Sequence, residues 1–281
     1  MARMIRSEAL HIIAAEAGRG ELTFPTNVAV AARIHQALDD PDCRIETAAK
    51  LLQAEPLLSA RVVALANSPA FNRSGQEVTD VGTAVSRLGF RAVRSLAMAL
   101  VTRQMSGASP VPAHREMAAR LWQHTAHVAA LSRVLARRVT RQDPETALFA
   151  GLIHEVGAFY LISRANDYPV LIDSEAAEGD DEIEAAIGNE VLKMLAVPDT
   201  VAAAVQVVWA GYLTLPPSSL GDTVLLANEL APVLSPFDSM PEWRDKSLAA
   251  SVDMVIGKET LVEILAESAE ELASLTKALQ F

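Results

Sequence analysis

Cysteine and aromatic residues are scarce in this sequence. The chain has 281 residues but a single cysteine, Cys43, which excludes an internal disulfide and indicates a small, partly buried thiol. Aromatic residues make up 5% of the chain, while hydrophobic residues make up 51%. Apolar content rich in Ala and Leu favours packed helices over sheets, which rely on aromatic and β-branched side chains. The composition therefore predicts an all-α fold.

Long hydrophobic runs are also missing. The nearest to the ~18 apolar residues of a membrane span is Val201–Leu215, which contains Gln206. Near the N-terminus, Glu8 and His11 interrupt the apolar stretch that a secretion signal needs. We therefore expect no membrane partner and a cytoplasmic location.

Positive charge is confined to one part of the chain. The net charge is −11, which argues against a nucleic-acid partner because phosphate contacts need a basic surface. Residues 87–141 nevertheless hold 10 basic and 1 acidic residue, whereas residues 173–281 hold 5 and 20. The basic band includes Arg87, Arg91, Arg94, Arg103, Arg133, Arg137, Arg138 and Arg141. It either attracts an acidic ligand or partner, or faces the acidic C-terminal half of its own chain.

Apolar residues recur at helical spacing along almost the whole chain, and Pro and Gly divide the pattern into helices. The segment Met105–His114 has the composition of a linker, so we predict two helical lobes, residues 1–108 and 109–281. The second lobe is predicted to contain helices at Met117–Val139, Glu145–Ser163, Asp181–Leu195, Pro198–Trp209 and Lys258–Leu279, an acidic loop at Asp173–Asp181, and a helix that holds Asn228.

Histidine and carboxylate side chains supply the first candidate site. His124 lies on the apolar side of its predicted helix, so it is either a core residue or one ligand of a buried site. His154 and Glu155 are adjacent, and both can reach one metal ion if a second histidine faces them.

Polar residues near Pro69 and the arginines that follow supply the second candidate site. Asn67 and Ser68 either close a helix just before Pro69 or form an exposed polar patch for a partner or ligand. Arg87, Arg91 and Arg94 are spaced i, i+4 and i+7, which predicts one basic helix face. A site between the lobes, lined by this face, would suit an anionic small molecule or nucleotide.

Several motifs together resemble the HDOD family, the HD-related output domain of bacterial signalling proteins. The resemblance runs from Phe24 to about Trp209 and rests on FPTNVAVAARI, AEPLLSARVVALANS, TAVSRLGFRAVRSL, WQHTAHVAALS, FAGLIHEVG and LAVPDTVAAAV, in that order. The family has Asp-Pro where this chain has Glu55-Pro56. The resemblance implies two helical lobes, the second related to the HD metal-dependent phosphohydrolases.

The resemblance also implies which positions of this chain correspond to the metal ligands of the HD superfamily. A histidine, a His-Asp pair and a distant Asp hold the metal there, and these positions correspond to His124, His154, Glu155 and Asn228. The neutral amide and the longer Glu side chain weaken such a site. We therefore expect a degenerate centre with no resident metal and no cofactor.

Further departures from the family concern substrate binding. The cyclic-dinucleotide phosphodiesterases of the superfamily have a lysine where this chain has Ala158. Many HDOD members carry additional histidines at positions that here hold Glu184, Val208 and Trp209. Hydrolysis needs groups that hold the substrate phosphate beside an activated water, so these changes predict that the chain is not an enzyme.

Three functions are consistent with the sequence. The first is a non-enzymatic signalling or regulatory module whose partner is another signalling protein. The second is a metal-dependent phosphohydrolase that uses His124, His154 and Glu155, with Asn228 contributing its carbonyl oxygen. The third is a binder of a phosphate-bearing small molecule through the arginine band, without hydrolysis.

Overall fold

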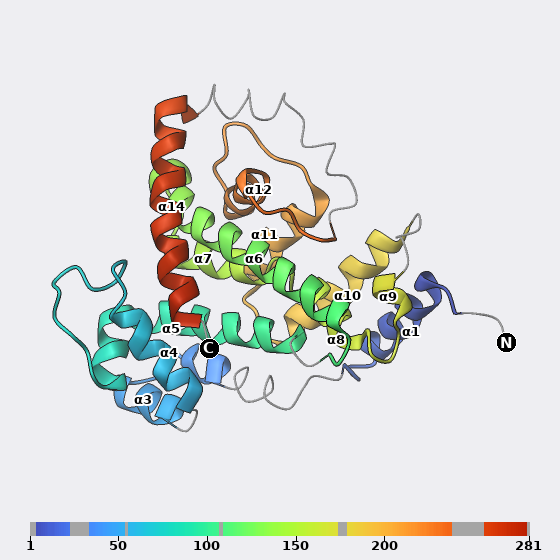
Figure 1. The fold of residues 1–281 in the computed structure, drawn as a ribbon, viewed down its shortest axis with the longest axis horizontal. Helices are drawn as coiled ribbons and strands as arrows, with labels where there is room; N and C mark the ends of the chain where they lie inside the picture. The colour runs from blue at the N-terminus through green and yellow to red at the C-terminus, as the bar shows by residue number, and fades with distance from the viewer. Residues whose placement is uncertain are drawn as a thin grey trace.

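The computed structural model describes residues 4–22, 34–53, 56–106, 109–173, 179–237 and 256–279. Within these ranges every regular element is a helix and no strand occurs, which confirms the predicted all-α class (Figure 1). The predictions that fall on residues 24–33, Glu55, residues 107–108 and residues 174–178 lie outside the described residues.

The helices follow one another with short connections. Those of the first half are α1 (Arg6–Gly18), α3 (Ile45–Gln53), α4 (Pro56–Ala66) and α5 (Val81–Ser106), with further helical residues at 34–38. Those of the second half are α6 (Pro112–Leu135), the π-helix η1 (Ala136–Thr140), α7 (Pro144–Ile153), α8 (Val156–Arg164), α9 (Val170–Asp173), α10 (Asp180–Met194), α11 (Asp199–Ala210), α12 (Leu220–Leu230) and α14 (Lys258–Leu279). The bounds of α14 are those predicted from the sequence.

Helices α6 and α7 form the centre of the molecule. Residues 147–153 of α7 are all buried, because the helix is covered by α5, α6 and α11. A Cβ atom at Gly151 would lie 2.7 Å from Cα of Ala129, so the missing side chain allows the backbones of α6 and α7 to approach. This close approach sets the spacing of the side chains that the two helices present to one another.

Both ends of the chain pack onto distant parts of it. Helix α14 lies across α6 and α4, and α1 lies beside α9 and α10 (Figure 1). Arg6 of α1 is buried and pairs with Asp180 of α10 at 2.8 Å. The N-terminal helix therefore packs on helices of the second half, and the predicted lobe boundary at residues 108 and 109 stays a prediction.

Two predicted helices differ from the structure by more than one residue, whereas those at Asp181–Leu195 and Pro198–Trp209 are each shifted by one. The helix predicted at Met117–Val139 begins earlier, at Pro112, and ends in the π-helix, after which Arg141 takes a left-handed conformation. The single helix predicted at Glu145–Ser163 is wrong, because a turn at residues 154–155 separates α7 from α8. At this turn the carbonyl oxygen of His154 accepts a hydrogen bond from Trp209 of α11.

Pro144–Arg164, and not the run Val201–Leu215 considered from the sequence, is the stretch long and apolar enough to cross a membrane by length and composition among the described residues. Of the 18 residues that make up its apolar window, 72% are buried inside the protein. The turn between α7 and α8 interrupts the stretch. Its apolar character is thus explained by its place in the core.

Candidate HD metal centre and its pocket

Three potential metal ligands meet at the junction of α6, α7 and α8. His124 lies on α6 and is fully buried. His154 ends α7, and Glu155 precedes α8. The indole Nε1 of Trp209 donates a hydrogen bond to the carbonyl oxygen of His154 (2.9 Å), which gives that oxygen a partner outside α7 and allows the helix to end there.

Backbone carbonyls fix the orientation of both imidazole rings. Nδ1 of His124 lies 2.8 Å from the carbonyl oxygen of Val233, and Nδ1 of His154 lies 2.7 Å from that of Gly151. Because a carbonyl oxygen only accepts hydrogen bonds, these partners assign a proton to Nδ1 in both rings. Each Nε2 then presents a lone pair, as in histidines that bind a metal.

The three donor atoms lie close enough to share one ion. The Nε2 atoms of the two histidines are 3.2 Å apart, and Oε1 of Glu155 is 3.9 Å from Nε2 of His124. The three donor atoms all lie within 4.8 Å of one another. Two nitrogen ligands of a tetrahedral zinc ion are ~3.3 Å apart, given Zn–N distances of ~2.0 Å. The donor set therefore fits one transition-metal ion, although the expectation of no resident metal stays a prediction.

The fourth predicted position, Asn228 on α12, lies beside the same ring. It forms a hydrogen bond with the His154 side chain. Burial lowers the pKa of His154 to about 4, an effect that the hydrogen bonds with Gly151 and Asn228 partly oppose. The ring is therefore neutral at pH 7, which is the protonation state that ligates a metal. Glu155 is the only carboxylate among the four predicted positions, so the centre carries little charge to hold a cation.

A cavity of about 310 Å³ opens beside this centre. Glu155, Asp181 and Glu184 line it, and no lysine or arginine does so among the described residues. Burial raises the pKa of the Glu184 carboxyl, and pairing with Arg6 at 2.5 Å partly opposes the rise. The remaining lining residues are His154, Gly157, Ala158, Ala185, Val208, Trp209, Asn228, Ser235 and Phe237. The pocket is thus acidic and partly aromatic.

The sequence profile of the HDOD domain matches residues 24–208, which is more than half of the chain. The chain belongs to the HDOD family. The match coincides with the extent of the resemblance found in the sequence motifs, residues 24 to about 209. No curated protein matches the chain.

Several solved structures share the fold of this HDOD protein. A proposed metal-dependent phosphohydrolase from Shewanella amazonensis SB2B aligns with a TM-score of 0.73 at 21% identity, covering 96% of this chain and 99% of that chain. An HDOD domain protein with unknown function from Geobacter sulfurreducens aligns with a TM-score of 0.64 at 20% identity, covering 98% of this chain and 100% of that chain. A proposed signal transduction protein from Marinobacter aquaeolei VT8 aligns with a TM-score of 0.62 at 19% identity, covering 98% of this chain and 66% of that chain. At these identities the likeness is one of fold.

Residues at which this HDOD protein is expected to differ from many family members line its pocket. Glu184, Val208 and Trp209, which replace the histidines of many family members, all line the cavity. Trp209 fits because Gly188 on α10 has no side chain, and a Cβ there would lie 2.7 Å from the indole ring. Sequence reasoning missed Asp181. Its only signal was a place in the acidic first turn of α10.

The weakness attributed to Asn228 leads to a prediction about metal affinity. Asn228→Asp places a second carboxylate at the centre, so we expect it to tighten Zn²⁺ binding by at least about tenfold. Competition with a chromophoric chelator measures the change. Asn189→Asp, on α10 and outside the pocket lining, adds the same charge as a control. Equal affinities in the two variants would show that Asn228 has no part in the centre.

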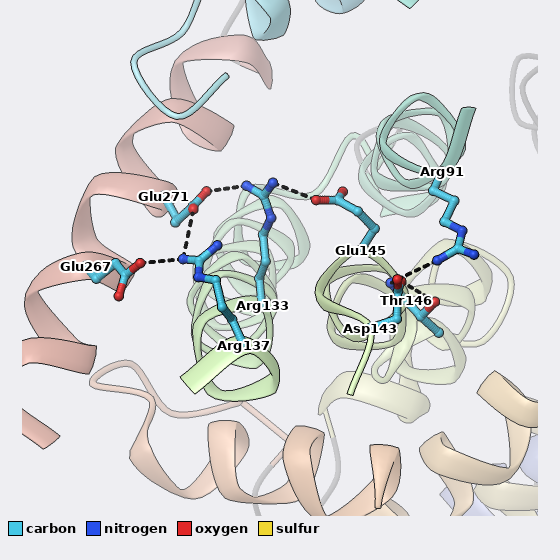
Figure 2. Close-up of polar contacts among 8 residues, drawn as sticks. All are labelled: Arg91, Arg133, Arg137, Asp143, Glu145, Thr146, Glu267 and Glu271. Carbon is cyan, nitrogen blue, oxygen red and sulfur yellow. Dashed lines mark hydrogen bonds and ion pairs between the residues drawn. The ribbon is translucent and has the colours of Figure 1, made fainter. Parts of the chain in front are cut away.

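Three arginines of the basic band, Arg133, Arg137 and Arg138, pair with the acidic helix α14 of their own chain. Figure 2 shows the guanidinium groups of α6 and η1 extending toward carboxylates on α14 and α7. The pairs are Arg133 with Glu271 and Glu145, Arg137 with Glu267 and Glu271, and Arg138 with Glu263 and Glu267. For this part of the band, the self-neutralising alternative is the one that the structure shows.

The three arginines of the second candidate site do not share one helix face. Gly89 has φ 77° and interrupts α5, so Arg87 precedes the kink while Arg91 and Arg94 follow it. Arg87 donates to the carbonyl oxygens of Ala66 (3.3 Å) and Gln76 (2.8 Å). The predicted continuous face is therefore wrong, and Arg91 and Arg94 remain together.

Asn67 and Ser68 take the helix-closing role. The Asn67 amide donates to the carbonyl oxygen of Val78 (2.7 Å) and accepts from its N–H (2.8 Å), which ties the loop after α4 to the start of α5. Ser68 is 4% exposed. The pair therefore does not present the exposed polar patch that was the alternative.

Proposed function

We propose that this HDOD protein is a non-enzymatic signalling module that acts by binding another signalling protein or a ligand. The acidic pocket is the observation that carries the proposal. Hydrolysis requires a substrate phosphate to be held beside the metal by cationic or polar donors. Glu155 and Asp181 line the pocket instead, and their negative charge disfavours a phosphate group there.

Changes elsewhere in the pocket support the same conclusion. Ala158 and Val208 offer no hydrogen-bonding side chain, and the indole N–H of Trp209 is already used by the carbonyl oxygen of His154. Apart from Asn228 and Ser235, a substrate phosphate would therefore find carboxylates and apolar surface where a hydrolase supplies donors.

A metal ion at this centre would be held by His124, His154 and Glu155, with the Asn228 carbonyl as a further oxygen ligand. Such an ion supplies Lewis-acid chemistry when bound. The side chains of this chain would use it to join α6, the α7–α8 turn and α12, which is a structural role.

A metal-dependent phosphohydrolase is the second candidate function. The observation in its favour is the donor set itself, two oriented histidines and one carboxylate within 4.8 Å. It differs from the first function in one measurable property, turnover that depends on His154.

Turnover assays on the metal-loaded protein test the proposal. The chain is incubated with Zn²⁺, Mn²⁺ or Fe²⁺ and a panel of phosphate monoesters and diesters, beside His154→Ala as the matched control. We expect equal, background release of product from both proteins. Hydrolysis by the unaltered chain that is lost in a folded His154→Ala variant would overturn the proposal in favour of the hydrolase.

A further inference from the structure

A second cavity, of about 220 Å³, lies away from the HD centre. Residues from α5, α7, the start of α11 and the helical segment 34–38 enclose it. Its lining is His35, Asp39, Arg91, Arg94, Ser95, Glu145, Thr146, Phe149, Pro198, Thr200 and Val201. None of these residues lines the pocket of the HD centre.

His35 is the most unusual group in this cavity. It is 1% exposed, and its Nδ1 atom has no hydrogen-bond partner among the described residues. The ring stacks on Phe149 with 5.3 Å between centroids, which fixes its orientation. A buried polar atom without a partner destabilises a protein, so a ligand in this cavity that bonded Nδ1 of His35 would remove that cost.

Two arginines give the cavity donors for an anion. Arg91 pairs with Asp143 through Nη1, and Arg94 pairs with Asp39 through Nη1. A guanidinium has five N–H donors in a planar fork, so each arginine keeps further donors beyond the ion pair. Figure 2 shows that Asp143 is also bonded to Thr146, at 2.8 Å to its N–H and 2.7 Å to its hydroxyl. Asp143 would therefore keep partners if Arg91 turned toward a ligand.

The carboxylates of the lining are already neutralised. Asp39 pairs with Arg94, and Glu145 pairs with Arg133 at 2.5 Å from outside the cavity. The start of α11 offers backbone N–H groups that no side chain caps, and Thr200 of its first turn lines the cavity. Asp199, in the same turn but outside the cavity lining, offsets part of the positive character of this helix end. Burial, and to a lesser extent the positive charge of Arg94, lowers the pKa of His35 to about 4.

We propose that this cavity binds a phosphate group, either inorganic phosphate or the end of a small phosphate monoester, through His35, Arg91, Arg94 and the start of α11. Two guanidinium forks, an imidazole and a helix N-terminus match the several acceptor oxygens of a phosphate better than the two of a carboxylate. The volume is below the ~300 Å³ of pockets that enclose a drug-sized ligand, so any larger group must extend outside.

Because the cavity lies between several helices, phosphate binding there is expected to stabilise the whole fold. The ligand would join residues 34–38 and α5 of the first half to α7 and α11 of the second half. A ligand that binds only the folded chain raises its stability by mass action. Phosphate is therefore expected to raise the melting temperature.

Calorimetry and thermal unfolding of the full chain test this proposal with inorganic phosphate and with adenosine 5′-monophosphate as probes. His35→Phe keeps a ring against Phe149 but removes Nδ1, and Arg91→Gln removes an exposed guanidinium without disturbing the core. Arg19→Gln, at the exposed end of α1, changes the net charge equally and is the control. We expect either substitution in the cavity to weaken phosphate binding by at least about tenfold, and the control to leave it unchanged.

The outcomes separate the two ligand sources. Tighter binding of the nucleotide than of phosphate identifies a phosphate ester as the ligand, and equal binding identifies free phosphate. If His35→Phe is more stable than the unaltered chain without phosphate yet gains nothing from its addition, the orphaned imidazole is a ligand group. Binding that survives Arg91→Gln unchanged, or no binding of either probe at millimolar concentration, would overturn the proposal.

Discussion

Replacing Arg133 by methionine is expected to lower the free energy of unfolding by about 3 kcal/mol, because the partly buried Glu145 loses its counter-charge and Glu271 keeps only the longer pair with Arg137. Arg133 is 9% exposed and donates to Glu271 of α14 and Glu145 of α7, both at 2.5 Å. Its guanidinium also lies 4.5 Å from the ring centre of Phe71. One side chain therefore joins α6 to α7, α14 and the loop after α4. Urea unfolding followed by circular dichroism measures the loss.

A neighbour in the same band is the matched control for Arg133. Arg138 pairs with Glu263, which is 65% exposed, and at 3.5 Å with Glu267, with which Arg137 also pairs. Water screens the first pair and Glu267 keeps a second partner, so Arg138→Met should cost about 0.5 kcal/mol. Substituting Glu145 and Glu271 by leucine in the Arg133→Met background should restore most of the stability, since no unpaired charge remains. Equal losses for Arg133→Met and Arg138→Met would contradict the account of the band as a partly buried network.

Gly151→Ala is expected to cost about 3 kcal/mol through overpacking. The added Cβ would lie 2.7 Å from Cα of Ala129, a backbone atom that cannot rotate away, and 3.1 Å from Oγ of Ser132. Helices α6 and α7 must separate to admit it. Because α6 holds His124 and α7 ends at His154, the same shift should also weaken Zn²⁺ binding.

Gly18→Ala tests whether the cost of Gly151→Ala comes from packing. Gly18 ends α1, and a Cβ there meets nothing within 4 Å. The substitution should be neutral or slightly stabilising, because alanine restricts the unfolded chain more than glycine does. Thermal unfolding of both variants checks the comparison. A Gly151→Ala variant as stable as Gly18→Ala would mean that α6 and α7 are not packed as closely as described.

The helical content and the location of the HD residues were predictable from the sequence. Periodicity alone marks most helices, and the long amphipathic pattern of α14 gives its bounds. His124 was placed on the apolar side of its helix by spacing, and it is fully buried. The difference in charge between residues 87–141 and 173–281 likewise indicated that part of the arginine band could pair with the acidic C-terminal half, as Arg133, Arg137 and Arg138 do with α14.

Features that depend on contacts between distant residues were not predictable. The turn at His154 relies on a hydrogen bond from Trp209, 55 positions away, which local pattern does not show. The kink at Gly89 separates arginines that ideal helical spacing would align. The cavity around His35 needs four segments to be assembled before the lack of a partner for Nδ1 can be seen.

We propose that the acidic pocket, and not only the missing carboxylate ligand, prevents hydrolysis. Turnover of bis(p-nitrophenyl) phosphate by the Zn²⁺-loaded Asn228→Asp variant tests it most directly, because this variant restores the ligand and leaves Asp181 and Glu184 in place. The account predicts stoichiometric zinc and no release of p-nitrophenol above that of the His154→Ala control. Zinc-dependent release by the Asn228→Asp variant would contradict it.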